Sequence, residues 1–152
     1  MYFSLESQND IPKTKKGYEL IYKIKFSMED VVMFSKITGD NNPIHTELEY
    51  AKNTIFKQPI VHGFFVGSVF SRIFGTEYPG LGTIYLSQTM RFLAPVFLEK
   101  FYYAKVILSD VDIIKGKVNI ITEIIDNNGA SVLAGEAKIM HNIYINQENS
   151  TE

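Results

Sequence analysis

Hydrophobic and polar positions divide the chain into a first half with helix-like spacing and a second half that alternates. Between residues 18 and 26, apolar and charged side chains alternate, which predicts a strand. Ser27 followed by Asp30 is a typical helix start, the apolar positions continue to Ile37, and Gly39 suits a helix end. We therefore expect a strand followed directly by a helix.

Two further helices are expected before the alternating half begins. Thr46 and Glu49 form a second capping pattern, which predicts a short helix ending at residue 52 or 53. Residues 62–74 (HGFFVGSVFSRIF) carry one formal charge if the histidine is neutral. A helix that is apolar nearly all round belongs inside a protein or a protein assembly. We predict that this segment is a central buried helix.

The second half is patterned as consecutive strands. Asp126–Gly129 is a strong hairpin turn and Lys115–Gly116 a weaker one. The expected strands span residues 84–93, 101–108, 117–125 and 132–145. Consecutive hairpins make an antiparallel sheet, and the apolar helix must cover one of its faces. The predicted class is α+β, with a meander around one central helix.

The chain is expected to form a single domain over residues 1–152, with a core from about 17 to 145. The first 16 residues and the last seven are polar, so we expect both ends to be frayed. The first 16 also lack the apolar core of a secretion signal. The longest weakly charged stretch, residues 60–71, is shorter than the ~20 residues of a membrane span. We expect a cytoplasmic protein with no membrane partner.

Composition excludes several kinds of chemistry. With no cysteine, the chain cannot form a disulfide framework, a thiolate zinc site, an iron–sulfur cluster or a cysteine nucleophile. A sequence pI of about 5.9 argues against broad binding to nucleic acid. Reactive groups must therefore come from carboxylates, imidazoles, hydroxyls or the backbone.

The segment with the strongest chemical character runs from Phe34 to Ala51 (FSKITGDNNPIHTELEYA). It places Asp40 five residues before His45, with turn-forming residues between them. A carboxylate and an imidazole that hold one water form an acid–base pair. The alternative is an ordinary polar turn in which Asp40 caps backbone amides and His45 is an incidental surface residue.

A second candidate lies at the start of the apolar helix, at His62 and Gly63. A helix N-terminus presents unpaired N–H groups, and glycine lets a ligand approach the backbone closely. Such N–H groups can stabilise a developing oxyanion. The alternative is a helix start that packs tightly, with His62 as a hydrogen-bonded structural histidine.

Together these segments resemble the motif of MaoC-like (R)-specific enoyl-CoA hydratases. The motif is an aromatic and a small residue, then G-D-x-N-P, an aliphatic residue and histidine, with alanine or serine following. Residues 34–45 and Ala51 match it at every specified position. The resemblance continues through residues 60–63, Ser71 and residues 88–96, and spans roughly residues 27 to 141.

This resemblance implies a hot dog fold and reversible hydration of trans-2-enoyl-CoA to (R)-3-hydroxyacyl-CoA. Asp40 and His45 match the catalytic pair, the Gly63 amide matches the group that binds the thioester oxygen, and Ser71 matches a supporting serine. Four other residues belong to the motif and are expected to support the site: Gly39, Asn42, Pro43 and His62. The implied metabolism is that of fatty acids or polyhydroxyalkanoates. The implied assembly is a homodimer or a dimer of dimers.

Other interpretations of the same residues remain open. The chain could be a dehydratase of 3-hydroxyacyl chains on acyl carrier protein, or a non-catalytic module that binds acyl thioesters. A metal site built from Asp40, His45 and His62 is a third possibility, although its spacing fits no metal motif. We expect no cofactor and no metal. Phe64, Phe65 and Phe70 either line an acyl pocket or belong to the core, and Arg91 either faces solvent or reaches the pocket.

Overall fold

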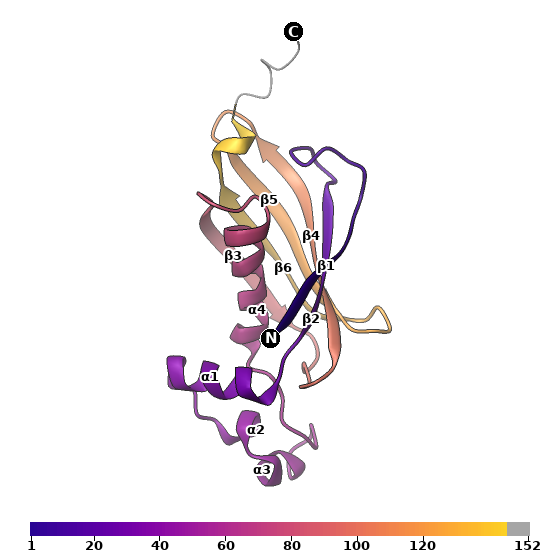
Figure 1. The fold of residues 1–152 in the computed structure, drawn as a ribbon, viewed down its shortest axis with the longest axis vertical. Coiled ribbons are helices and arrows are strands. Elements are labelled where there is room, and N and C mark those ends of the chain that lie inside the picture. Colours follow the sequence, from indigo (N-terminus) through magenta and orange to yellow (C-terminus); the bar gives the residue numbers. More distant parts are fainter. Residues whose placement is uncertain (146–152) are drawn as a thin grey trace.

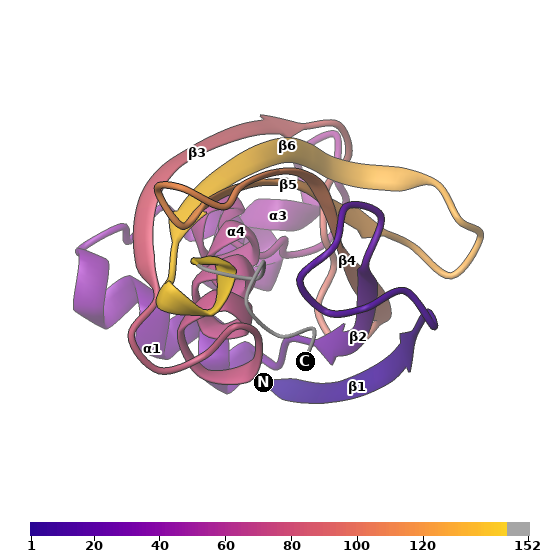
Figure 2. The ribbon, with the colours of Figure 1, turned by 90° about the horizontal axis from the view of Figure 1, so that it is seen from above.

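In the computed structural model, which describes residues 1–145, one six-stranded antiparallel sheet bends around a central helix (Figures 1 and 2). The strands are β1 (Tyr2–Gln8), β2 (Glu19–Lys25), β3 (Ile84–Phe92), β4 (Phe101–Asp112), β5 (Lys117–Ile125) and β6 (Ser131–Met140). Their order in the sheet is β1-β2-β4-β5-β6-β3. Only β4, β5 and β6 form consecutive hairpins: β3, which the predicted meander placed before β4, pairs with β6 instead, and β3 and β1 are the two edges.

The helices lie on one side of the sheet and at one end of it. They are α1 (Met28–Thr38), α2 (Pro43–Thr46), α3 (Leu48–Lys52) and α4 (Gly63–Arg72), and a π-helical segment (Ile73–Glu77) continues α4. Helices α1, α2 and α3 gather near the start of α4, at the lower end of Figure 1. This clustering brings the polar motif of residues 39–45 to the N-terminal end of the central helix.

The core lies between α4 and the concave face of the sheet. The inner face of α4 and its continuation contributes Val66, Val69, Phe70, Ile73 and Phe74. Alternating positions of the strands supply the opposite side, including Ile24, Ala104, Ile120, Ile124, Leu133 and Ile139, all fully buried. This helix packed inside an antiparallel sheet confirms the α+β class and is the arrangement of a hot dog fold.

The central helix is not enclosed on all sides within one chain. Phe64 is 71% exposed, and Ser68 and Ser71 also lie on the outward face of α4. Residues 62–74 are apolar nearly all round, but the sheet of one chain covers only part of the surface of α4. The open face is mixed, because one large apolar ring lies beside two serine side chains.

Local capping follows the sequence at the first helix but not at the third. Ser27 and Asp30 form the predicted capping box, and Gly39 ends α1 with a left-handed φ of 78°. The third helix begins at Leu48 with Glu47 as its N-cap and no side-chain cap, so the capping role predicted for Thr46 is wrong. Thr46 instead belongs to α2, because Pro43 starts a separate turn of helix before it.

Two expectations about the ends of the chain also need correction. The N-terminal segment is not frayed: β1 pairs with β2 from Tyr2 to Gln8, and the terminal ammonium contacts Asp30 at 2.5 Å. The last strand ends at Met140, and a 3-10 turn over Asn142–Tyr144 follows it. The expectation for the last seven residues lies outside the described part of the chain.

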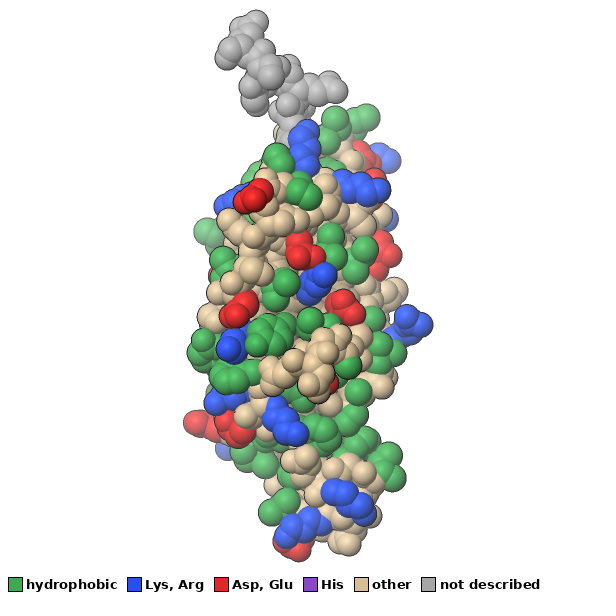
Figure 3. All heavy atoms as spheres, turned by 90° about the vertical axis from the view of Figure 1, so that its right-hand side faces the viewer, with side chains coloured by type: hydrophobic (Ala, Val, Ile, Leu, Met, Phe, Trp, Pro, Cys, Tyr) green, Lys and Arg blue, Asp and Glu red, His purple; other side chains and the backbone are tan. Residues whose placement is uncertain are grey.

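Charged side chains of both signs mix on the face shown in Figure 3 rather than forming a patch of one sign. None of the helices within residues 1–145 is both long enough and apolar enough to cross a lipid bilayer.

Candidate active site

The motif at residues 39–45 folds as a helix end joined directly to a helix start. Gly39 closes α1 in the left-handed conformation, and Asn42 caps α2 by accepting a hydrogen bond from the Ile44 amide at 3.2 Å. Pro43 occupies the first helical position, where its missing N–H costs nothing. Because these residues fix the turn, Asp40 and His45 are held on one side of it.

His45 is fixed by the segment that leads into α4. Its Nδ1 lies 2.8 Å from the carbonyl oxygen of Ile60, and the Ile60 amide donates back to Ile44. A carbonyl can only accept, so Nδ1 carries the hydrogen and Nε2 is left for other partners. The side chain is 9% exposed. His45 is therefore an oriented imidazole rather than an incidental surface residue.

His62 lies beneath His45 and is the more deeply buried of the two, with 2% exposure. Their rings stack with centroids 3.8 Å apart. Its Nε2 lies 3.2 Å from both the Ser35 hydroxyl and the backbone carbonyl of Asp40. Burial lowers the pKa of His62 below its usual 6.5, and the neighbouring His45 acts in the same direction, whereas the hydrogen bond that His62 donates to the Asp40 carbonyl acts against them.

Asp40 has an exposed side chain, and its Oδ1 accepts a hydrogen bond from the Asn42 amide at 3.3 Å. One ligand-type atom from each of Asp40, His45 and His62 lies within 4.8 Å of the others. The structure thus brings the predicted acid–base pair together. Two of the four imidazole nitrogens already lie against backbone carbonyls, Nδ1 of His45 at Ile60 and Nε2 of His62 at Asp40, which leaves one nitrogen on each ring for any further ligand.

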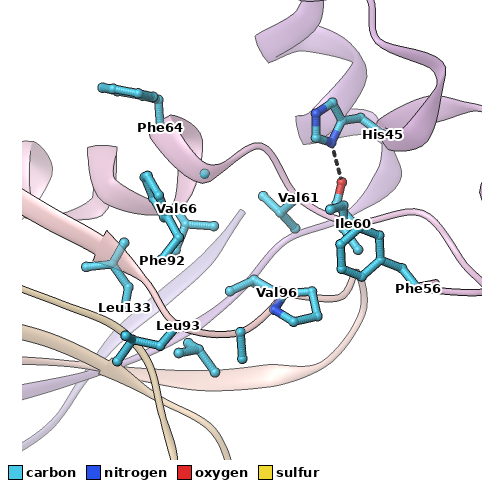
Figure 4. Close-up of a pocket in the computed structure, with 14 residues that line it drawn as sticks. His45, Phe56, Ile60, Val61, Phe64, Val66, Phe92, Leu93, Val96 and Leu133 are labelled. Carbon is cyan, nitrogen blue, oxygen red and sulfur yellow. Dashed lines mark hydrogen bonds between the residues drawn. The ribbon is translucent and has the colours of Figure 1, made fainter. Parts of the chain in front are cut away.

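An apolar cavity of about 480 Å³ opens beside His45. Its lining, drawn in Figure 4, comes from the start of α4, the end of β3 and the loop after it, and β6. His45 and Phe56 lie on one side of the space, and Phe64, Phe92 and Leu133 lie on the other (Figure 4). A mostly apolar cavity with few polar groups is typical of a small-molecule site.

Gly63 lies in the cavity wall as the first residue of α4. The N–H groups of a first helical turn have no intrahelical partner, and the His62 side chain makes no capping hydrogen bond to them. No acidic residue in that turn opposes the positive end of the helix dipole. A Cβ at Gly63 would lie 2.9 Å from the Phe92 ring, so a side chain here would crowd the cavity.

Not every residue singled out from the sequence joins this cluster. Ser71 lies eight residues beyond Gly63 on the outward face of α4, about 12 Å farther along the helix axis at ~1.5 Å per residue. Phe70 belongs to the core, whereas Phe64 lines the cavity. Arg91 is exposed on β3 and is not among the residues that line the cavity.

Sequence reasoning missed Ser35 as part of the site. It lies on the buried side of α1, 5% exposed, with its hydroxyl against His62. The motif requires only a small residue at this position, so the pattern alone did not distinguish a hydroxyl with a partner from a residue chosen for size. Its polarity, next to the aromatic Phe34, was the available hint.

Comparisons with known proteins agree with this geometry. Residues 8–129 match the MaoC like domain. An (R)-specific enoyl-CoA hydratase of Aeromonas caviae is 35% identical over 76% of this chain and 86% of its own length. A mitochondrial 3-hydroxyacyl-[acyl-carrier-protein] dehydratase of Solanum lycopersicum is 38% identical over 76% of this chain and 70% of its own.

Among solved structures, the (R)-hydratase from A. caviae involved in PHA biosynthesis superposes with a TM-score of 0.80 and 32% identity. The superposition covers 83% of this chain and 96% of that one, which confirms the hot dog fold. The family match spans most of the chain, and the motif residues that define the resemblance lie together at the start of α4. The chain belongs to the MaoC-like family of hydratases and dehydratases.

Proposed function

We propose that the protein catalyses the reversible hydration of trans-2-enoyl-CoA to (R)-3-hydroxyacyl-CoA. One observation carries the proposal: an oriented imidazole, a nearby carboxylate and a free helix N-terminus meet at an apolar cavity. The hydratase relatives, 35% identical in one case, support the same reaction. The chain is therefore proposed to be a hydro-lyase.

In the proposed reaction, Asp40 accepts a proton and His45 donates one. The carboxylate of Asp40 takes a proton from water as the water oxygen bonds to C3 of the enoyl thioester. The C2=C3 electron pair moves toward C1, and the thioester oxygen becomes an enolate. His45, protonated at Nε2, then gives its proton to C2. Transfer of the proton from Asp40 to Nε2 of His45 restores the starting state.

The Gly63 amide is proposed to hold the enolate oxygen. It lies at the positive end of α4 and in the wall of the cavity, which supports this role. Removing one such donor costs about 3–4 kcal/mol in other enzymes, so it would be a large part of the barrier reduction. The acid–base pair and the amide act on neighbouring atoms of one substrate, which favours addition from one face.

The supporting residues are proposed to act on the turn rather than on the substrate. Gly39, Asn42 and Pro43 hold the turn that carries Asp40, as their caps and helix positions suggest. Ser71 is proposed to support the site through α4, since its hydroxyl lies about two helical turns from Gly63. The proposed scheme requires no cofactor.

The acyl carrier is the main open alternative within this reaction. A relative named as an acyl-carrier-protein dehydratase is 38% identical, so the reverse reaction on carrier-bound substrates is the second candidate. A non-catalytic thioester-binding module is less well supported, because it would not need Asp40 and His45 within reach of each other.

The proposal is tested with the purified protein and three substrates, crotonyl-, hexenoyl- and octenoyl-CoA. Loss of the enoyl-thioester absorbance with at least one of them, and chiral analysis giving the (R)-3-hydroxyacyl product, is the expected result. If none of the three is hydrated, the hydratase proposal fails. The same acyl chains on acyl carrier protein, assayed at equal concentration, decide which carrier is preferred.

We also propose that the working form is a homodimer or a dimer of dimers in the cytoplasm. Strand β3 forms an edge of the sheet, and Ile84, Leu86 and Phe92 on it are 50%, 42% and 51% exposed. An exposed apolar edge strand can pair with a strand of another chain, and a second copy of this chain has an identical edge. The metabolism proposed is that of fatty acids or polyhydroxyalkanoates.

A further inference from the structure

His62 is a buried titratable group to which the chemistry above gives no step. Its side chain is 2% exposed, yet it contacts both members of the proposed pair. Nε2 lies 3.2 Å from the backbone carbonyl of Asp40, and the ring stacks on His45 at 3.8 Å. A residue that is held this closely against both partners can set their relative position.

The contacts of His62 determine where its hydrogen lies. The carbonyl of Asp40 can only accept, so Nε2 must carry the hydrogen and donate it. The Ser35 hydroxyl lies at the same distance from Nε2 and shares that hydrogen. Within residues 1–145, Nδ1 of His62 is the one buried side-chain polar atom without a hydrogen-bond partner. In a neutral ring that carries its hydrogen on Nε2, Nδ1 is an acceptor, and the absence of a group that would accept a hydrogen from Nδ1 is consistent with this tautomer.

The neutral state also fits the charges around the ring. Asp40 and His45 are the charged or titratable groups that act on His62: the first favours a charged ring and the second opposes it. Burial opposes it more strongly than either. A second positive charge 3.8 Å from a protonated His45 would be costly in a buried setting. His62 is therefore suited to hold its neighbours without exchanging a proton with the substrate.

We propose that His62 is a positioning residue, which fixes the peptide of Asp40 by donation from Nε2 and seats the ring of His45 by stacking. The role rests on the proposed hydratase function, since the pair it positions is the pair that function uses. Ser35 completes the arrangement by holding the ring of His62 from α1. The peptide of Asp40 and the ring of His45 are thus fixed by one side chain.

Two substitutions separate the two contacts. His62→Gln keeps an amide N–H close to the position of Nε2 but removes the ring, whereas His62→Phe keeps a stacking ring but removes the donor. A displacement of about 1 Å can cost on the order of 10²-fold in rate, so we expect His62→Phe to lower kcat about 10- to 100-fold with KM changed less than about threefold. His62→Gln should recover kcat to within about fivefold of the wild type, by the same reasoning.

The pH profile distinguishes positioning from proton transfer. Both variants should keep both limbs of the kcat profile at the wild-type pH values, because the titrating groups remain. The inference is overturned if His62→Phe has the wild-type kcat, or if both variants lose the same limb. His141→Gln is the control. His141 directly follows the last residue of β6, at the end of that strand away from Leu133 and the cavity, so this variant should leave kcat and the pH profile unchanged.

A measurement on the wild-type protein tests the inference without any turnover. Nitrogen-15 NMR of the His62 ring should show a hydrogen on Nε2 and a bare Nδ1 at pH 7. A hydrogen on Nδ1, or a charged ring at that pH, would overturn the inference even if the variants do not fold. If the spectra agree but no enoyl thioester is hydrated, the hydratase proposal alone has failed.

Discussion

The imidazole rings of His45 and His62 stack with centroids 3.8 Å apart and planes inclined by 27°. One comes from the short helix α2 and the other is the N-cap residue of α4, so the stack joins the motif turn to the central helix. Because two adjacent positive charges are disfavoured, a charged His62 would oppose the proton transfer proposed for His45. The stack therefore fits the proposed division of roles, in which His45 transfers a proton and His62 positions it.

Removing the acid–base groups one at a time tests their roles directly. Asp40→Asn and His45→Gln should each lower kcat on an enoyl-CoA by about 10²- to 10⁴-fold, the usual contribution of general acid–base catalysis. Asp40 is exposed, and glutamine at the 9% exposed position of His45 keeps a polar side chain of similar size, so the circular dichroism spectrum should be unchanged. Wild-type turnover in either variant would remove that residue from the mechanism.

Matched controls come from the opposite end of the molecule. Asp110→Asn changes an exposed carboxylate near the end of β4, and His141→Gln changes a histidine bound to the Leu81 carbonyl. Both should keep the wild-type kcat. A loss in the controls of the same size as in the test variants would point to a general effect of charge or folding.

Crowding the helix N-terminus should impair substrate approach while the amide itself remains. A Cβ at position 63 would lie 2.9 Å from the Phe92 ring, and that ring is the free end of a side chain that is 51% exposed. Gly63→Ala should therefore fold normally but lower kcat/KM about 10- to 100-fold, because about 1 Å of misplacement can cost 10² in rate. Steady-state kinetics with crotonyl-CoA measures this.

A substitution at Phe92 tests whether the loss of kcat/KM in Gly63→Ala is steric. Phe92→Ala removes the ring that the new methyl group would meet, so Gly63→Ala with Phe92→Ala should regain part of kcat/KM relative to Gly63→Ala alone. Phe92→Ala by itself is the control for the enlarged cavity. Equal kcat/KM in the single and double Gly63 variants would show that Phe92 does not mediate the effect.

The motif turn was predictable because its structure is local. Gly39, Asn42 and Pro43 each act through their own backbone or a residue two positions away, so the helix end at Gly39 and the turn after it were predicted, although the helix start at Pro43 was not. The contact of Ser35 with His62 joins α1 to α4 across the fold. A short sequence pattern cannot show a contact between residues that are far apart in the chain. The pair of Asp40 and His45 was therefore predicted, but the contact between Ser35 and His62 was not.

The fold shows the same division between local and long-range causes. Strand β5 spans Lys117–Ile125 as the alternation predicted, because every second residue is buried and three of these four, Val118, Ile120 and Ile124, are apolar. Strand β1 was missed because its residues are mostly exposed and it forms by pairing with β2. The cap of α3 was assigned to Thr46 because the pattern could not show that α2 already uses this residue.

Ser71 offers a test of a supporting role at a distance. It is exposed on α4 and lies about 12 Å along the helix from Gly63, at ~1.5 Å per residue. Ser71→Ala should therefore lower kcat less than Asp40→Asn does, and it should not change the pH profile. Ser68→Ala, on the same face, is the matched control. A loss as large as that of Asp40→Asn would make Ser71 part of the reacting site.

The burial of His62 should make stability depend on pH. Its folded pKa lies below the usual 6.5, so between those two values the unfolded chain binds more protons than the folded chain. The free energy of unfolding is therefore fully retained above pH 6.5 and falls as the pH drops below it. Urea unfolding at several pH values from 7.5 to 5 should show this decline in the wild type.

The comparison that isolates His62 is the variant without a titrating ring. His62→Gln keeps the donor but cannot be protonated, so its stability should decline less over the same pH range. His141 remains in both proteins, and its contribution cancels in the difference; repeating the comparison in a His45→Gln background removes the coupled neighbour. Parallel curves for the two proteins would show that His62 is not the source of the pH dependence.

The exposed edge strand β3 provides the test of the proposed dimer. Leu86 is 42% exposed and Ile84 is 50% exposed, so both would be covered if a second copy paired along this edge. Sedimentation of the wild type should give a mass of at least twice the 17.3 kDa of one chain. Leu86→Lys places a charge against its own copy across a two-fold axis, and it should shift the protein toward a 17.3 kDa species.

Ile114→Lys is the matched control, because Ile114 is 86% exposed in the turn between β4 and β5 and lies away from this edge. If Leu86→Lys and Ile114→Lys sediment alike, β3 is not the contact, and a wild type of 17.3 kDa alone would exclude the dimer.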